Sequence, residues 1–412
     1  MKAEIITIGT EILLGHTVDT NSAWLGKSLS EVGVEVQRVT SISDNADAII
    51  KTLDEILPST NWVIITGGLG PTKDDITKKV LVKYFNDELI YRPEIFEHIK
   101  DLFSRMGRVP NLLNKEQAYF PKKAKVFPNK RGTAQCMLWE YNEVKYISLP
   151  GVPFEMEGIV EDYILPRMIK EQDHFIENRY FLVQGIPESD LALKLTNWEA
   201  ALTETFSLAY LPSPGLVKLR LTCRGRIEDS DSLFKELDSQ SIQIREILGK
   251  DIFTESLRSL EYVISDLFKK SGQTLATAES FTGGNIAAKI TSVPGSSEFF
   301  KGSVVAYSNE IKIKELGVDD NEIILNGPVS EIVALQMANG IKSKYEVDWS
   351  ISTTGYAGPI GGQGVTAGTV WLAIVGPDVS WVKKFSMGSN RERTISKSCL
   401  VIFNQLRLLI DK

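Results

Sequence analysis

The first 85 residues alternate short apolar runs with amphipathic stretches, and this alternation restricts the fold more than any other feature of the chain. Strands and helices are predicted in turn at 4–8, 20–32, 34–40, 44–57, 62–66 and 76–85. Strands that alternate with helices form a parallel sheet covered by helices. We therefore expect an α/β, doubly wound N-terminal domain with its ligand at the carboxyl ends of the strands.

At 412 residues the chain is too long for one ordinary core, so we expect more than one domain. A polar stretch at 170–178 follows Pro166 and predicts the end of the first domain. The next part has the pattern of a small α+β module, and the last part that of a further α/β domain. The predicted domains are 1–172, 173–254 and 255–412.

Charge and composition exclude several classes of protein. The net charge is −7 and the isoelectric point is about 5.4, so we expect no nucleic-acid binding by the chain as a whole. The N-terminus enters a strand pattern directly, and no apolar run reaches bilayer length, which predicts a cytoplasmic protein without membrane contact. Cys136, Cys223 and Cys399 are isolated in sequence, which argues against disulfides and cysteine metal sites.

A glycine-rich loop, TGGLGPTKDDIT, lies between the strand at 62–66 and the following helix. Gly67, Gly68 and Gly70 would let a phosphate approach the backbone closely. Asp74 and Asp75 would repel a bare phosphate, which indicates a bridging cation or a hydroxyl-bearing ligand. The alternative is a strand-to-helix turn capped by an aspartate, with no ligand.

A serine, Ser280, lies just before Thr282-Gly283-Gly284 and the helical run that begins at Asn285. We expect the start of this helix to offer unpaired N–H groups to a phosphate or to an oxyanion. The glycines would let the ligand come close.

Serine needs a base to act as a nucleophile, and the three histidines lie far upstream, at 16, 98 and 174. A Ser-His-Asp triad within the last domain is thereby excluded, and Lys312 is the candidate base. Its pKa would have to fall by roughly 3 units to act near neutrality. The alternative is that Ser280 caps a helix and Lys312 is a solvated surface charge.

Five motifs in the last domain resemble, in order and spacing, the C-terminal domain of the CinA family: AES-x-TGG, VPGSSEFFKGSVVAYSNEIKIKELGV, GPVSEIVALQMANGI, TTGYAGP and AGTVWLAI. That domain is associated with deamidation of nicotinamide mononucleotide. The resemblance implies Ser280 as nucleophile, Lys312 as base, and Tyr307 and Thr354 as further active-site residues. It implies substrate contacts from Thr282, Gly283, Gly284 and Gly355 and a phosphate contact from Arg391, with no cofactor.

The N-terminal motifs resemble the molybdopterin-binding fold, and more closely the N-terminal domain of CinA proteins, which is described as an ADP-ribose pyrophosphatase. They are Gly9-Thr10-Glu11-Ile12, Asp19-Thr20-Asn21, TGGLGPT-x-DDIT and Leu149-Pro150-Gly151-Val152-Pro153. The resemblance implies a divalent metal ion, because hydrolysis of a diphosphate needs its charge neutralised. Asp75, Asp19 and Glu11 are then the expected metal contacts, and Asn21 with the loop glycines the expected substrate contacts.

The middle segment resembles the KH-like domain of CinA proteins, but no GXXG sequence occurs between 179 and 253. A KH domain clamps a nucleic-acid backbone with that loop. We therefore interpret the segment as a spacer or oligomerisation module, and we expect a homodimer.

Two positions depart from the family pattern. Phe281 stands where relatives usually have cysteine, so cysteine cannot be the nucleophile, and the loop 358–368 is shorter than usual. The sequence thus predicts a bifunctional enzyme acting on nicotinamide mononucleotide and ADP-ribose. The alternative is a competence-associated adaptor that binds a nucleotide or a pterin without turnover.

Overall fold

The structure is a computed structural model that describes residues 1–70, 75–105, 107–172 and 174–410. The chain forms two compact units: Met1–Glu177 with Arg224–Ser230, and Asn178–Cys223 with Asp231–Lys412. Most of the predicted middle domain therefore packs with the C-terminal part. The predicted bounds of the three domains stay predictions. None of the described helices has the length and apolar character needed to cross a bilayer.

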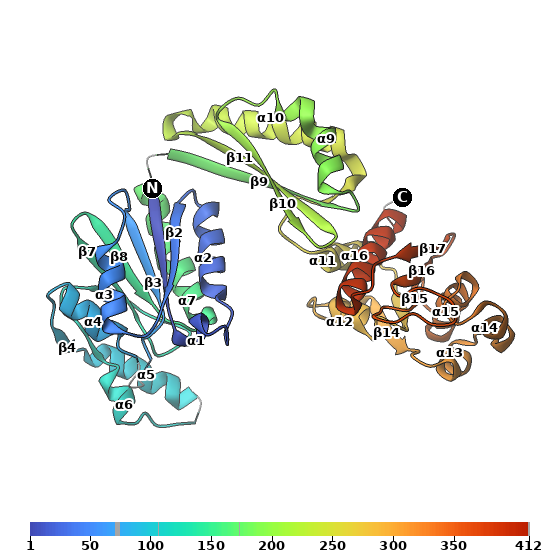
Figure 1. The fold of residues 1–412 in the computed structure, drawn as a ribbon, viewed down its shortest axis with the longest axis horizontal. Helices are drawn as coiled ribbons and strands as arrows, with labels where there is room; N and C mark the ends of the chain where they lie inside the picture. Colours follow the sequence, from blue (N-terminus) through green and yellow to red (C-terminus); the bar gives the residue numbers. More distant parts are fainter. Residues whose placement is uncertain (71–74, 106, 173, 411–412) are drawn as a thin grey trace. The chain divides into compact units, whose positions relative to one another are not determined.

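The first unit is built on a six-stranded sheet in the order β2-β1-β3-β8-β7-β6 (Figure 1). Its strands are β1 (Lys2–Ile8), β2 (Glu35–Ile42), β3 (Trp62–Thr66), β6 (Lys125–Phe127), β7 (Cys136–Tyr141) and β8 (Val144–Leu149). The first three strands and β8 run parallel, whereas β7 and β6 form an antiparallel edge. The predicted α/β, doubly wound arrangement is confirmed, and the antiparallel edge was not predicted.

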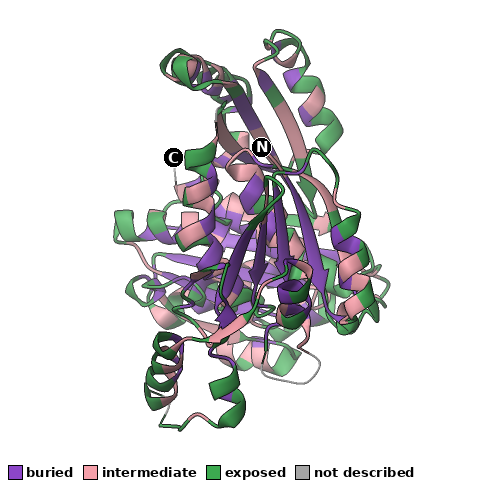
Figure 2. Ribbon diagram, turned by 90° about the vertical axis from the view of Figure 1, so that its left-hand side faces the viewer, coloured by how far each residue is buried: buried purple, intermediate pink, exposed green. Residues whose placement is uncertain are grey.

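Both faces of this sheet are buried. Ile5 and Ile64 belong to one hydrophobic cluster, and their sequence neighbours Ile6 and Ile65 belong to another. Alternate side chains of a strand point to opposite faces, so helices cover the sheet on both sides. Figure 2 shows the strands as buried and the outer turns of the helices as exposed.

Two helices beside the central strands, α2 and α3, begin at residues whose side chains cap them. Asp19 accepts a hydrogen bond from Ser22 N at the start of α2 (Thr20–Glu31), and Asn45 caps α3 (Ala46–Asp54). The prediction that α3 opens at Asp44 was one residue early. The remaining elements are α1 (Thr10–Leu13), α4 (Thr77–Tyr84), β4 (Leu89–Tyr91), α5 (Pro93–Arg105), α6 (Leu112–Glu116), β5 (Tyr119–Pro121), α7 (Pro153–Ile159), the π-helix η1 (Val160–Ile164) and α8 (Leu165–Glu171).

The middle segment is a four-stranded sheet in the order β10-β11-β9-β12. Its elements are β9 (His174–Gln184), α9 (Glu188–Glu199), β10 (Phe206–Ser213), β11 (Leu216–Arg226), η2 (Ile227–Asp229), α10 (Ser230–Leu248), η3 (Gly249–Asp251) and β12 (Ile252–Thr254). Leu182 and Phe253 from this sheet belong to the same buried cluster as Leu406 near the C-terminus. The segment therefore shares a core with the C-terminal domain.

The C-terminal sheet has the order β14-β13-β15-β16-β17. The parallel strands are β13 (Leu275–Glu279), β14 (Phe300–Val305) and β15 (Trp349–Gly355), and the antiparallel ones β16 (Thr369–Val375) and β17 (Ser380–Ser386). One face packs on α11 (Leu260–Ser271), α12 (Asn285–Thr291) and α16 (Arg391–Ile410). The other packs on α13 (Asn309–Leu316), α14 (Asp320–Asn326) and α15 (Glu331–Tyr345).

Each unit has a central strand at which the strand order reverses. The next strand in the chain pairs on one side of it, and the strand after that pairs on its other side. β1 lies between β2 and β3, and β13 lies between β14 and β15. Ligands of open α/β sheets bind at such switch points, beyond the carboxyl ends of the strands. Both predicted sites follow these two central strands.

Candidate active sites at the ends of two sheets

The C-terminal site brings together a serine and a lysine from separate elements. Ser280 follows β13 directly, and Lys312 lies in the first turns of α13. The Lys312 Nζ is 3.1 Å from Ser280 Oγ and 3.0 Å from the carbonyl oxygen of Ala306. The structure therefore places the predicted nucleophile and base within hydrogen-bond distance.

Lys312 is not a solvated surface charge. Its exposed fraction is 2%, and that of Ser280 is 7%. Burial lowers the pKa of Lys312 from 10.5 to about 8, because an ammonium group is poorly solvated there. A substantial fraction of this amine is neutral near pH 8 and can accept a proton.

Local structure explains how the lysine reaches the serine. Ser308 caps α13 by accepting a hydrogen bond from Ile311 N, which starts the helix close to the end of β14. Lys312 lies one turn further, and its side chain returns toward Ala306. Ser280 is fixed from the other side, since its N–H donates to the Thr353 carbonyl oxygen at 2.9 Å.

The turn after Ser280 differs from the expected anion site. Oε2 of Glu279, a fully buried side chain, accepts hydrogen bonds from Gly284 N at 3.0 Å and Ile286 N at 3.1 Å. Its Oε1 accepts one from Ala287 N at 2.8 Å. The expectation that these N–H groups are free for a phosphate or an oxyanion was wrong, because a carboxylate of the protein already occupies the start of α12.

Thr282 and Gly283 complete the turn. The Thr282 hydroxyl is 2.7 Å from the Thr353 hydroxyl, and Gly283 has a positive φ of 59°. The Thr282 side chain therefore fixes the turn to β15, and its hydroxyl is fully buried. This geometry shows that the turn is shaped by Thr282, Gly283 and Gly284. Their contact with substrate stays a prediction.

The other predicted residues form the surroundings of the pair. The Thr354 hydroxyl donates to the Pro328 carbonyl oxygen at 2.6 Å, and Gly355 is packed against Val370. Thr353 rather than Thr354 contacts the Ser280 backbone. A catalytic role for Thr354 is therefore still a prediction, and its observed contact supports the strand end.

Tyr307 and Arg391 form the exposed part of the site. The Arg391 guanidinium donates to the Tyr307 hydroxyl at 2.7 Å and lies 3.5 Å from the Gly358 carbonyl oxygen. Tyr307 is 61% exposed, so this pair faces solvent rather than the core. The predicted cation therefore lies beside Tyr307, which follows β14 and Ala306, and beside Gly358 at the start of the loop 358–368.

The structure shows where the two expected departures from the family pattern lie. Phe281 is buried and belongs to the core cluster that contains Ile286 and Phe403, so it packs the domain and does not face Lys312. The loop 358–368 folds back on itself through reciprocal hydrogen bonds between Gly362 and Val365. Neither departure removes a group from the Ser280–Lys312 pair.

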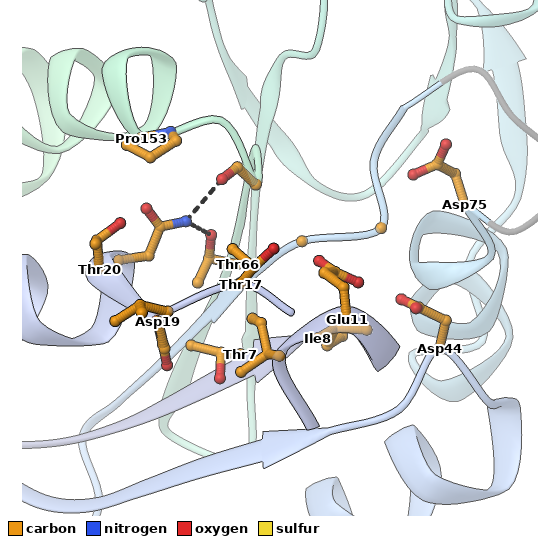
Figure 3. A pocket seen from close by; sticks show the side chains of 16 residues that line it. Thr7, Ile8, Glu11, Thr17, Asp19, Thr20, Asp44, Thr66, Asp75 and Pro153 are labelled. Carbon is orange, nitrogen blue, oxygen red and sulfur yellow. Dashed lines mark hydrogen bonds between the residues drawn. The ribbon is translucent and has the colours of Figure 1, made fainter. Parts of the chain in front are cut away.

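The N-terminal site is a cavity of about 280 Å³ at the ends of β1 and β3 (Figure 3). It is lined by the predicted contacts Glu11, Asp19, Asn21, Gly67, Gly68 and Asp75 together with Thr7, Ile8, Ile12, Thr17, Val18, Thr20, Asp44, Thr66, Gly151 and Pro153. Gly70 does not line it, but its N–H donates to Asp75 Oδ1 at 2.8 Å. Pro71, Thr72, Lys73 and Asp74 lie outside the described residues.

Asn21, on α2, forms hydrogen bonds with the end of β3 and with the turn that follows β8. Its Nδ2 donates to Thr66 Oγ1 at 3.0 Å and to the Gly151 carbonyl oxygen at 2.8 Å. Among the residues that the structure describes, its buried Oδ1 has no hydrogen-bond partner. Gly67 has a φ of 112°, and a Cβ there would lie 2.1 Å from the Ile8 carbonyl oxygen, so glycine is required.

The carboxylates of this cavity were predicted as metal contacts. Figure 3 shows Glu11 and Asp75 on one side and Asp19 on the other, where Asp19 caps α2. Across the four described ranges, no three His, Cys, Asp or Glu residues are grouped as a metal cage. Oxygen ligands of this kind suit a Mg²⁺ ion that takes one or two carboxylates and completes its shell with substrate phosphates and water.

Asp44 was not identified from the sequence as a residue of this site. It lies at the carboxyl end of β2, lines the cavity beside Glu11, and accepts a hydrogen bond from Thr10 N at 3.0 Å. The signal was available, because β2 is parallel to β1 and its end meets the same edge of the sheet.

Comparison with known proteins gives one result over the whole chain. Family models described as a probable molybdopterin binding domain, the damage-inducible protein CinA KH domain and the CinA C-terminal domain match residues 4–170, 178–254 and 257–410. A CinA-like protein of Cytophaga hutchinsonii is 42% identical over 98% of this chain and 97% of its own length. A CinA-like protein of Flavobacterium psychrophilum is 42% identical, covering 97% and 96%. The crystal structure of a competence damage-inducible protein A (ComA) from Klebsiella pneumoniae is 31% identical over 37% of this chain and 95% of that chain, with a TM-score of 0.36.

Proposed function

Because the chain belongs to the CinA family and has its three domains in the family's order, we propose that its C-terminal domain deamidates nicotinamide mononucleotide. The observation that carries the proposal is the contact between Ser280 Oγ and the buried amine of Lys312. A serine becomes nucleophilic when a neighbouring base takes its proton. Burial lowers the pKa of this amine, so it is neutral at a lower pH than the amine of a solvated lysine.

The reaction follows from these two groups. Lys312 Nζ takes the hydroxyl proton as Ser280 Oγ bonds to the carboxamide carbon, and the resulting ammonium then gives that proton to the leaving nitrogen. Breaking the C–N bond releases ammonia and leaves an ester on Ser280. A water molecule, deprotonated by the same amine, cleaves the ester and yields nicotinic acid mononucleotide. None of these steps uses a metal ion.

Lys312 is oriented by a carbonyl oxygen rather than by a carboxylate. Ala306 accepts a hydrogen bond from Nζ at 3.0 Å, which aims the amine at Ser280 without adding a negative charge. A carboxylate at this place would raise the lysine pKa. The arrangement therefore suits a general base working near neutral pH.

Arg391 supplies the positive charge for the other end of the substrate. Its guanidinium lies beside the exposed Tyr307 hydroxyl, outside the buried pair. Guanidinium groups bind phosphates through paired N–H donors. We assign the mononucleotide phosphate to this position and its carboxamide to Ser280.

For the N-terminal domain we propose metal-dependent cleavage of ADP-ribose. The support is the cavity at the β1 switch point, where carboxylates face the glycine turn that a diphosphate can approach. Asp75 and Glu11 would hold the divalent ion, which supplies charge neutralisation of the diphosphate. Asn21 Oδ1, which no described residue contacts by a hydrogen bond, would accept one from a ribose hydroxyl.

The first test is ammonia release from nicotinamide mononucleotide by the full chain in the presence of EDTA. Release that is lost in Ser280→Ala supports the amidase. The adaptor alternative predicts binding of the nucleotide with no release and no effect of Ser280→Ala. ADP-ribose cleavage measured after metal is restored tests the N-terminal proposal separately.

A further inference from the structure

A buried carboxylate adjoins the proposed nucleophile, and neither the reaction nor the predicted site uses it. Glu279 is the last residue of β13, and its exposed fraction is 0%. Its side chain accepts three hydrogen bonds from backbone N–H groups, those of Gly284, Ile286 and Ala287. A charged side chain without solvent needs such partners, because burial of an unpaired charge is strongly unfavourable.

These N–H groups belong to the set that a helix leaves without internal partners. Ile286 and Ala287 lie in the first turn of α12, and Gly284 is its N-cap residue. A bound anion commonly satisfies such groups. Here the protein's own carboxylate takes that place, so the turn from Ser280 to Gly284 is closed by a fixed side chain rather than by substrate.

The Glu279 backbone holds the other half of the site. Its carbonyl oxygen accepts a hydrogen bond from Ala306 N at 2.8 Å. The carbonyl oxygen of the same Ala306 binds Lys312 Nζ. Glu279 is therefore hydrogen-bonded through its side chain to the turn that follows Ser280. Through its backbone it is hydrogen-bonded to Ala306, which orients Lys312.

We propose that Glu279 is the positioning residue of the C-terminal site: its carboxylate fixes the Ser280 turn on α12 while its carbonyl fixes Ala306 beneath Lys312. This inference rests on the proposed amidase function. The carboxylate does not touch the reacting atoms. It sets the separation of Ser280 Oγ and Lys312 Nζ.

Glutamine is the informative substitution, because it keeps the length of the side chain. Its amide oxygen can accept from the N–H groups, but its NH₂ would face another N–H donor. In Glu279→Gln we expect kcat to fall about 100-fold, the loss that a displacement of about 1 Å in a catalytic pair produces, with KM unchanged. A merely structural defect would lower the amount of folded enzyme and change the KM and kcat values of the remainder little.

Glu261→Gln is the matched control. Glu261 lies in α11, its side chain is 14% exposed, and its carboxylate is 3.9 Å from Lys289 Nζ of α12. It thus contacts the same helix away from the helix start. We expect this variant to retain wild-type kcat.

Two readouts separate this inference from the amidase proposal. The first is the rate at which a fluorophosphonate probe labels Ser280, which reports the activated serine without any nucleotide. The second is amide hydrogen exchange over 280–290 in the wild-type chain, where a side chain that accepts hydrogen bonds from the N–H groups of Ile286 and Ala287 would protect them.

The expected result is protected amides in the wild type, with labelling and ammonia release both about 100-fold slower in Glu279→Gln. A wild-type chain that labels but releases no ammonia refutes the amidase and leaves Glu279 to be judged by labelling. The inference is overturned if Glu279→Gln labels within about threefold of wild type. If that variant fails to fold, rapid exchange at Ile286 and Ala287 in the wild type overturns it as well.

Discussion

Lys312 Nζ lies 3.1 Å from Ser280 Oγ although the two residues are 32 positions apart in the chain. Two neighbouring strands bring them together, since Ser280 follows β13 and the segment leading to Lys312 follows β14. The pair thus depends on the sheet and not on local sequence.

Substitution of either member of the pair should abolish the amidase. In Ser280→Ala and Lys312→Met we expect ammonia release to fall by at least about 10³-fold, because nucleophile and base act as one unit. Lys314→Met is the control, since Lys314 is an exposed residue of the same helix. Ammonia release by Lys312→Met at the wild-type rate would rule out the lysine as base.

The amidase should gain activity as the pH rises. Lys312 must be neutral to accept a proton, and its pKa is about 8. We therefore expect kcat/KM to rise about tenfold per pH unit below this value and to level off above it. The measurement is a pH profile of ammonia release between pH 6 and about 9.5. A profile that falls with pH would indicate an acid in place of the base.

Lys312 should also reduce stability at neutral pH. Its folded-state pKa is lowered from 10.5 to about 8, so between these values the unfolded chain binds more protons and stability rises with pH. Below about pH 8 the full penalty applies, at most about 3 kcal/mol. We expect Lys312→Met to melt at a higher temperature than wild type at pH 7, with the difference shrinking by pH 10.5. Equal melting temperatures at pH 7 would contradict the buried, destabilised ammonium.

Arg391 should control binding rather than chemistry. In Arg391→Ala we expect KM for nicotinamide mononucleotide to rise about 10- to 100-fold with kcat nearly unchanged, because a charged hydrogen bond to phosphate contributes about 1.5–3 kcal/mol. Arg393→Ala, two residues further along α16, is the control. A loss in kcat alone would place Arg391 at the reacting atoms instead.

The N-terminal cavity can be tested through its carboxylates. We expect Asp75→Asn and Asp44→Asn each to lower metal-dependent ADP-ribose cleavage by about 10- to 100-fold, the usual loss for groups at or around a metal ion. Asp47→Asn is the control, because Asp47 is exposed on α3 and does not line the cavity. Ammonia release should be unaffected in all three variants. Wild-type cleavage by Asp75→Asn would remove that residue from the metal site.

Regular elements with a strong pattern were predictable from the sequence. The strand Trp62–Thr66 has the predicted bounds, since it is a single apolar run between turn residues. The three-residue strands β4, β5 and β6 were not predicted. A run of three residues has no measurable period, and it pairs only because another strand lies beside it.

The site was predictable where its residues follow the strands, and not where they act through contacts. Ser280 and Lys312 were candidates by residue type, and the resemblance to CinA proteins implied their roles, whereas Glu279 was given no role. Its role depends on three amides that lie five to eight positions further along the chain. Asp44 was predicted only as the start of the helix 44–57, although it follows a predicted strand of the same parallel sheet.

The last helix has a consequence for any attempt to divide this protein. Arg391, its first residue, contacts Tyr307 at the proposed active site. Further along, Asn404 donates to Gln184, and Arg407 donates to the Lys250 carbonyl oxygen, both in the middle segment. A helix rises 1.5 Å per residue, so Arg391 and the contacts with the middle segment are about 20 Å apart along the same helix. A fragment cut at the start of the C-terminal domain would keep Arg391 but lose what anchors the far end of its helix.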